Sequence, residues 1–157
     1  MTSASAPVVR ARIHRSFASQ AEDVFDAWID PQKIREWFGP GLGEMTAMDV
    51  DPRVGGHFRL VQRRRDGDAV HTGEYEELER PRRLVFTWQT PPLVDRSRVH
   101  VEIAAAADGC ALTLTHEMEA KWASFVPRIE ESWTKMTEAM ARMLERRAER
   151  TPPSGET

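Results

Sequence analysis

The stretch FVPRIEESWTKMTEAMARMLERRA, residues 125–148, decides the fold of this 157-residue chain. Its apolar side chains recur every three or four residues, which is the spacing of one face of an α-helix. That face consists of Ile129, Trp133, Met136, Met140, Met143 and Leu144. Charged residues occupy the other faces, where Glu131 and Lys135 form a favourable i,i+4 pair. We therefore expect one long amphipathic helix with a single apolar face to bury.

The chain before this helix predicts strands joined by short turns. Apolar and polar residues alternate from Val8 to Phe17, as in a half-buried strand. Further β segments cover residues 45–50, 56–62, 70–78, 84–89, 99–106 and 111–117. Hairpin signals at Asp66-Gly67 and Asp108-Gly109 join neighbouring segments tightly, so consecutive strands should pair antiparallel.

Two short helices are expected directly after the first strand. SQAE at residues 19–22 has the spacing of a capping box, in which Ser19 and Glu22 satisfy backbone donors at a helix start. Asp30-Pro31 predicts the start of a second helix, which Gly39 and Pro40 would end.

These elements predict an α+β fold in one domain over residues 8–148. A sheet of six to seven strands twists and curls, and the long C-terminal helix must cover it. The ends, residues 1–7 and 149–157, are small, polar and rich in proline, so we expect flexible tails.

Composition excludes several classes of protein. A net charge of −3 gives no reason to expect nucleic acid as a partner. No run approaches the roughly 20 apolar residues that a membrane span needs. Cys110 is the only cysteine, and no signal-peptide pattern precedes the first arginines, so the expected location is the cytoplasm.

Five blocks of the sequence resemble a known family. They are RSFASQAEDVFDAWIDPQKIREWFGP (15–40), VDPRVGGHFRL (50–60), GEYEELERPRRLVFTW (73–88), VHVEIAAAADGCALTLTHE (99–117) and SWTKMTEAMARMLE (132–145). The family is that of the bacterial relatives of the activator of the ninety-kilodalton heat-shock chaperone, in the SRPBCC or START-like superfamily. The resemblance implies the helix-grip fold, also seen in birch-pollen-allergen-like proteins, with a cavity between sheet and helix. Activities in the superfamily include lipid binding, polyketide cyclisation and chaperone contact, so fold alone does not assign one.

If the cavity exists, its lining follows from strand alternation and from the helix stripe. The predicted ligand-binding residues are Trp37, Phe38, Phe58, Leu60, Gln62, Tyr75, Phe86, Trp88, Val101, His116, Trp133, Met136 and Met140. The alternative for each apolar residue is ordinary core packing. Gln62, Tyr75 and His116 could orient a polar ligand atom, whereas His57, His71 and His100 are expected at the surface.

No catalytic motif, metal-binding spacing or cofactor fingerprint stands out. The first hypothesis is a non-catalytic module that binds a hydrophobic or aromatic small molecule, without a cofactor. The second is a cyclase, dehydratase or hydrolase that uses His116 or Tyr75 as acid or base. The third is a co-chaperone that contacts a chaperone through its surface. We also consider a homodimer.

Overall fold

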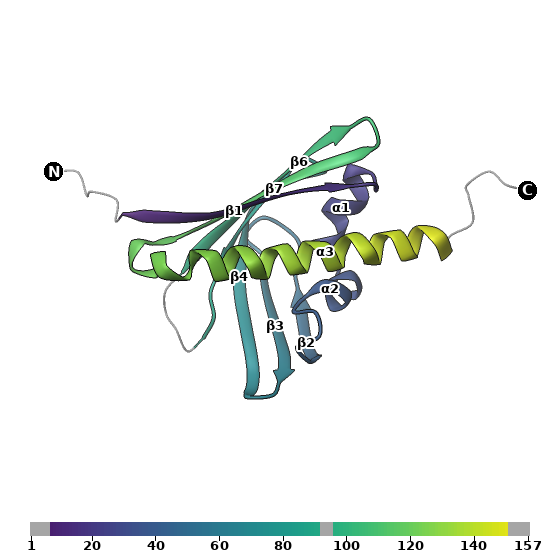
Figure 1. The fold of residues 1–157 in the computed structure, drawn as a ribbon. Coiled ribbons are helices and arrows are strands. Elements are labelled where there is room, and N and C mark those ends of the chain that lie inside the picture. Colours follow the sequence, from purple (N-terminus) through teal and green to yellow (C-terminus); the bar gives the residue numbers. More distant parts are fainter. Residues whose placement is uncertain (1–6, 92–95, 151–157) are drawn as a thin grey trace, which may run out of the picture.

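The computed structural model describes residues 7–91 and 96–150, and shows one curved sheet crossed by a long helix (Figure 1). Strand β1 (Val8–Phe17) is followed by helices α1 (Ala21–Ala27) and α2 (Pro31–Trp37). Strands β2 (Glu44–Val50), β3 (His57–Arg64), β4 (Gly67–Glu79), β5 (Arg83–Trp88), β6 (Ser97–Ala106) and β7 (Gly109–Glu119) follow. A 3₁₀ turn, η1 (Ala120–Phe125), leads into helix α3 (Val126–Arg150).

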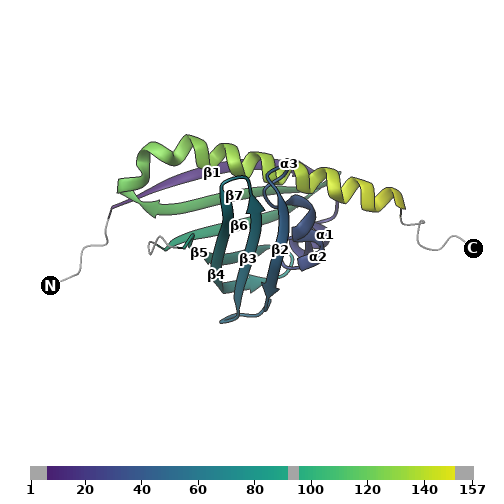
Figure 2. The ribbon, with the colours of Figure 1, turned by 90° about the horizontal axis from the view of Figure 1, so that it is seen from below.

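All seven strands form a single antiparallel sheet in the order β1-β7-β6-β5-β4-β3-β2. The first strand therefore pairs with the last, beside which α3 begins. Figure 2 shows α3 lying along β1, with α1 and α2 near the C-terminal half of the helix. The predicted helix-grip fold, with seven antiparallel strands and a long C-terminal helix, is confirmed.

Strand β4 forms the corner of the sheet. Its first part, up to Glu74, pairs with β3, and its last part, from Tyr75, pairs with β5. The register shifts between Tyr75 and Glu77, and such bulges bend a strand. Gly73 lies just before this bulge, where a Cβ would stand 2.0 Å from the carbonyl oxygen of Thr87. Any larger residue at position 73 would push the two strands apart.

Aromatic rings fill much of the space between the sheet and the helices. Trp28 and Trp37 pack edge to face with centroids 5.0 Å apart, and Trp28 also packs against Trp133 of α3 at 5.8 Å. The indole Nε1 of Trp37 donates to the carbonyl of Ala27 at 2.8 Å, which fixes α2 against α1. The core thus joins all three helices.

The two predicted helix starts have different outcomes. Asp30 caps α2 as expected, because its carboxylate accepts from the backbone N–H of Gln32 at 2.9 Å and Pro31 occupies the first turn. The capping box at Ser19 is wrong. Gln20, with an extended backbone, is the N-cap residue and no side chain caps α1, so Ser19 lies one residue too early.

Several boundaries extend beyond the prediction. Strand β4 begins three residues earlier than expected, at Gly67, and β7 continues to Glu119. Helix α3 runs through Glu149 and Arg150, where the sequence predicts the start of the C-terminal tail. The rest of both predicted tails, apart from Pro7, lies outside the described residues. Among the described helices, none has the length and apolar character to cross a membrane.

Candidate functional site

A cavity of about 440 Å³ opens between the inner face of the sheet and the N-terminal half of α3. The described residues that border it come mainly from the loop after α2, from strands β3 to β7, from the η1 turn and from the first turns of α3. Its size is within the range of pockets that hold small molecules.

Rings in tilted and edge-to-face contacts form the apolar wall of this cavity. Trp88 of β5 and Trp133 of α3 lie with centroids 5.4 Å apart. His71 packs on Trp88 at 4.9 Å and meets Phe38 edge to face at 5.1 Å. Met136 adds a flexible thioether from the next turn of α3. Such a wall offers polarisable aromatic surface to an apolar ligand.

His116 is the most buried polar group in the wall, with 4% of its surface exposed. Trp133 Nε1 lies 3.0 Å from His116 Nδ1, and because an indole N–H can only donate, Nδ1 must be the acceptor. The proton of the neutral ring therefore sits on Nε2, which donates to Ser97 Oγ at 2.7 Å. The Ser97 hydroxyl in turn donates to the carbonyl of Trp88 at 2.9 Å.

Burial keeps this ring neutral. It lowers the pKa of His116 from 6.5 to about 4, because charging the ring inside the wall is unfavourable. Both ring nitrogens are already bound, so at neutral pH His116 has no free lone pair toward the cavity. Its clear role is to tie β6, β7 and α3 together.

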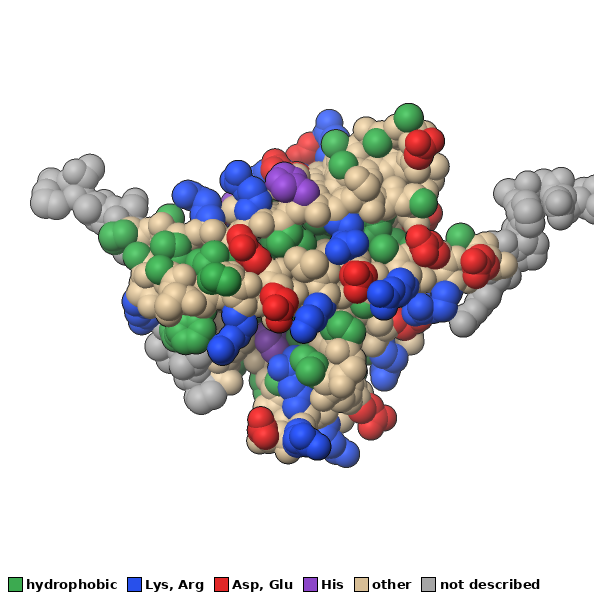
Figure 3. Space-filling model, viewed as in Figure 1, with side chains coloured by type: hydrophobic (Ala, Val, Ile, Leu, Met, Phe, Trp, Pro, Cys, Tyr) green, Lys and Arg blue, Asp and Glu red, His purple; other side chains and the backbone are tan. Residues whose placement is uncertain are grey.

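The mouth of the cavity combines exposed apolar side chains with basic ones. Leu42, on the loop after α2, is 52% exposed, and Phe125 of η1 is 38% exposed. Trp122 packs against Phe125 at 5.4 Å. Figure 3 shows hydrophobic side chains gathered over the N-terminal end of α3, with Lys and Arg side chains beside them. Basic residues that line the cavity are Arg64, Arg96, Arg128 and Lys135.

Gln62 is fully committed to holding the loop after α2. Its Nε2 donates to the carbonyls of Gly39 at 2.9 Å and Gly43 at 3.1 Å. Its Oε1 accepts from Arg64 Nε at 2.7 Å. Gln62 does not line the cavity, yet it positions two parts of the wall, the loop and the Arg64 side chain.

The predicted site residues fall into three groups. Phe38, Trp88, His116, Trp133 and Met136 line the cavity of about 440 Å³. Trp37, Phe58, Leu60, Tyr75 and Phe86, together with Trp88 and Trp133, surround a second space of only about 20 Å³. Gln62, Val101 and Met140 line neither. The second space holds at most about one water molecule, so its lining residues pack as core. Burial there raises the pKa of Tyr75.

The expectation that His71 lies at the surface is wrong. It stands directly opposite Leu60 in the β3–β4 pairing, and paired residues share a face of the sheet. Burial and the nearby charge of Arg64 lower its pKa from 6.5 to about 4, and its Nδ1 is buried without a hydrogen-bond partner in the structure. The sequence held a signal, because His71 precedes the inward-facing Tyr75 by four residues and so has the same parity.

Sequence reasoning missed the aromatic side of the mouth. Trp122 and Phe125 follow the last strand in a segment with neither strand nor helix periodicity. Their spacing of three residues is that of one face of a 3₁₀ turn, where such residues eclipse. This was the available signal. Within residues 7–91 and 96–150, no cluster of metal-binding side chains is present.

The fold is that of a helix-grip protein with a cavity between its sheet and its long helix. The sequence profile described as activator of Hsp90 ATPase homolog 1-like protein matches residues 18–145, and the chain belongs to this family. A search of curated proteins gave no match.

Solved structures share this fold at low sequence identity. An AHSA1-like protein from Aeromonas hydrophila is 23% identical with a TM-score of 0.78, over 94% of this chain and 100% of that one. A protein of unknown function from Staphylococcus aureus is 17% identical with a TM-score of 0.82, over 92% of this chain and 98% of that one. DynU16, from the dynemicin biosynthetic locus, is 23% identical with a TM-score of 0.71, over 87% of this chain and 47% of that one.

Proposed function

We propose that this protein binds a hydrophobic, partly aromatic small molecule in the cavity between the sheet and α3. The observation that carries the proposal is the space of about 440 Å³ walled by Trp88, Trp133, Phe38 and His71. Cavities of this size are few in well-packed domains, because empty space forfeits dispersion contacts.

Apolar burial supplies most of the free energy that favours binding. A ligand that loses about 200 Å² of apolar surface gains about 5 kcal/mol at about 25 cal/mol per Å². Stacking on the indoles adds about 1 kcal/mol. The sum of about 6 kcal/mol corresponds to a dissociation constant of about 40 μM, and the cost of immobilising the ligand makes the expected binding weaker than this value.

The hydrogen bonds of His116 favour binding over acid–base catalysis. A general base needs a free lone pair within reach of the substrate, and the Nδ1 lone pair of His116 already accepts from Trp133. Tyr75 lies at the small second space rather than at the cavity. The catalytic hypothesis therefore loses the two residues on which it depended. The chaperone hypothesis rests on the family resemblance alone, and the homodimer and the cytoplasmic location also stay predictions.

The test uses a neutral aromatic probe. N-phenyl-1-naphthylamine, which fluoresces in apolar surroundings, should bind saturably and raise the melting temperature. Met136→Trp fills the cavity from α3 and should weaken probe binding by at least tenfold. Glu138→Trp is the matched control, because it adds the same side chain at an exposed position of the same helix. Absence of saturable binding, or equal binding by Met136→Trp, would refute the proposal.

A further inference from the structure

The charge of the cavity lining is opposite to that of the whole chain. Among the described residues that line it, four are basic, namely Arg64, Arg96, Arg128 and Lys135, and one is acidic, Glu119. With neutral histidines, these described lining residues carry a net charge of +3, whereas the chain carries −3. Lys121 pairs with Glu119 at 3.4 Å and Glu131 pairs with Lys135 at 3.4 Å, so these two outside partners together leave the net charge unchanged. A cavity of this sign favours a negatively charged guest.

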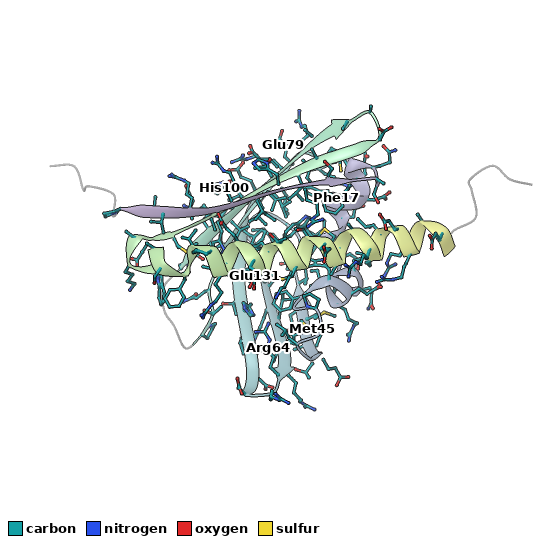
Figure 4. The ribbon with its side chains drawn as sticks, in the orientation of Figure 1. Phe17, Met45, Arg64, Glu79, His100 and Glu131 are labelled. Carbon is teal, nitrogen blue, oxygen red and sulfur yellow. The ribbon has the colours of Figure 1, made fainter. Side chains whose placement is uncertain are left out.

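Arg64 is the basic residue best placed to hold such a guest. It extends from the end of β3 (Figure 4), and its side chain is half-buried. Desolvation lowers its pKa from the ordinary value. No carboxylate of the described residues forms an ion pair with it, although the same chain pairs Arg80 with Asp26 and Arg98 with Glu76. Partial burial without a counter-ion is unfavourable unless a ligand supplies one.

The hydrogen bonds of Arg64 leave its terminal nitrogens available. A guanidinium has five N–H donors, and the one on Nε goes to Gln62 Oε1 at 2.7 Å. The four donors on the terminal nitrogens have no acceptor among the described residues. Because Gln62 is itself fixed by two backbone carbonyls, the fork is held in one orientation. A preorganised fork of this kind fits the two oxygens of an oxyanion.

His71 completes the polar corner. Its ring lines the cavity beside Trp88, and its Nδ1 lacks a partner in the structure. The neutral ring places no second positive charge next to Arg64. Aromatic wall and oxyanion-binding corner are thus adjacent in one cavity.

We propose that the ligand is an amphipathic organic anion, whose apolar body lies on the aromatic wall and whose acidic group is bound by the terminal nitrogens of Arg64. This inference rests on the proposed function and adds the chemical class of its ligand.

Two probes with the same rings separate this inference from the proposed function. 1-Anilinonaphthalene-8-sulfonate is N-phenyl-1-naphthylamine with an added sulfonate. The anionic probe should bind the unmodified protein about tenfold more tightly, since charge-assisted bidentate hydrogen bonds have about this effect. Raising NaCl from about 0.05 to about 0.5 M should weaken binding of the anionic probe, because salt screens charge interactions, and should not weaken binding of the neutral probe.

Substitutions assign the effect to Arg64. Arg64→Met should weaken the anionic probe about tenfold and change the neutral probe less than twofold. Arg64→Lys, which keeps the charge without the fork, should fall between. Arg63→Met is the matched control, because Arg63 is the exposed neighbour on the same strand and does not line the cavity, and it should change neither affinity.

Competition distinguishes the acidic group. Octanoate and octyl phosphate should both displace the anionic probe. The competitor that displaces it at the lower concentration shows whether a carboxylate or a phosphate is the preferred group. Octanol, which has no charge, should displace the probe at least tenfold less well. The anion inference alone would be overturned if the two probes bind with equal affinity. It would also be overturned if the preference for the anionic probe is unchanged in Arg64→Met and at high salt. Failure of the neutral probe to bind would overturn the proposed function, and this inference with it.

Discussion

Replacing His116 with glutamine should change stability in opposite directions at pH 7 and pH 5. Glutamine can accept from the indole of Trp133 and donate to Ser97, as the neutral imidazole does. The geometry will be imperfect, so the variant should be less stable by about 1 kcal/mol at pH 7.

The pH dependence follows from the pKa of His116, which is 6.5 in its ordinary state and about 4 in the folded protein. Between these values the unfolded chain binds more protons, so stability falls as the pH falls. The folded protein loses about 2 kcal/mol from this group at pH 5, and about 3 kcal/mol in all once the pH is near 4. Glutamine does not titrate. The variant should therefore be about 1 kcal/mol more stable than the unmodified protein at pH 5.

Urea unfolding followed by far-ultraviolet circular dichroism at the two pH values measures both differences. Other titrating groups, including His71, are common to the two proteins and cancel in the comparison. His57→Gln, which removes an exposed ring, controls for the substitution itself. If His116→Gln changes stability equally at pH 7 and pH 5, within about 0.5 kcal/mol, the buried neutral imidazole described above is refuted.

Three further predictions concern the surroundings of the cavity. Gln62→Leu removes three hydrogen bonds, so it should lower stability by about 2–3 kcal/mol and speed amide hydrogen exchange across residues 39–43. Protection from exchange equal to that of the unmodified protein would contradict the role assigned to Gln62. Asp30→Ala removes the cap of α2 and should cost about 1 kcal/mol in urea unfolding, and a cost near zero would show that the cap is dispensable. Leu42→Ser should change stability by less than about 0.5 kcal/mol, yet weaken the neutral probe a few-fold, because Leu42 lines the mouth; an unaltered affinity would exclude Leu42 from the ligand contact.

Much of the fold was predictable because its signals are local. Trp133 and Met136 belong to a periodic apolar stripe, and the turns at Asp66 and Asp108 join strands that can pair only antiparallel. The capping-box prediction failed for a local reason as well. Ser19 and Gln20 are adjacent and both polar, and the N-cap of α1 falls on Gln20, one residue after Ser19, so the spacing of Ser19 and Glu22 does not cap the helix.

The cavity could not be located in the same way. Alternation correctly places Phe58 and Phe86 on the inner face of the sheet, but does not say whether their rings leave space. Here they pack with Trp28 and Trp37 and close the deep end, while the open end lies near η1. Arg64 was also beyond sequence reasoning, because its significance depends on Gln62 and on the lack of a carboxylate, which only the packed structure defines.

The placement of the tryptophans gives the protein a built-in optical reporter. Three of its five indoles, Trp88, Trp122 and Trp133, line the cavity, and the remaining two belong to the aromatic core behind it. A molecule that enters would displace solvent from these rings and shift their intrinsic emission. Unlabelled libraries could therefore be screened on the unmodified chain, and any compound that binds in the cavity should shift the wavelength of this fluorescence.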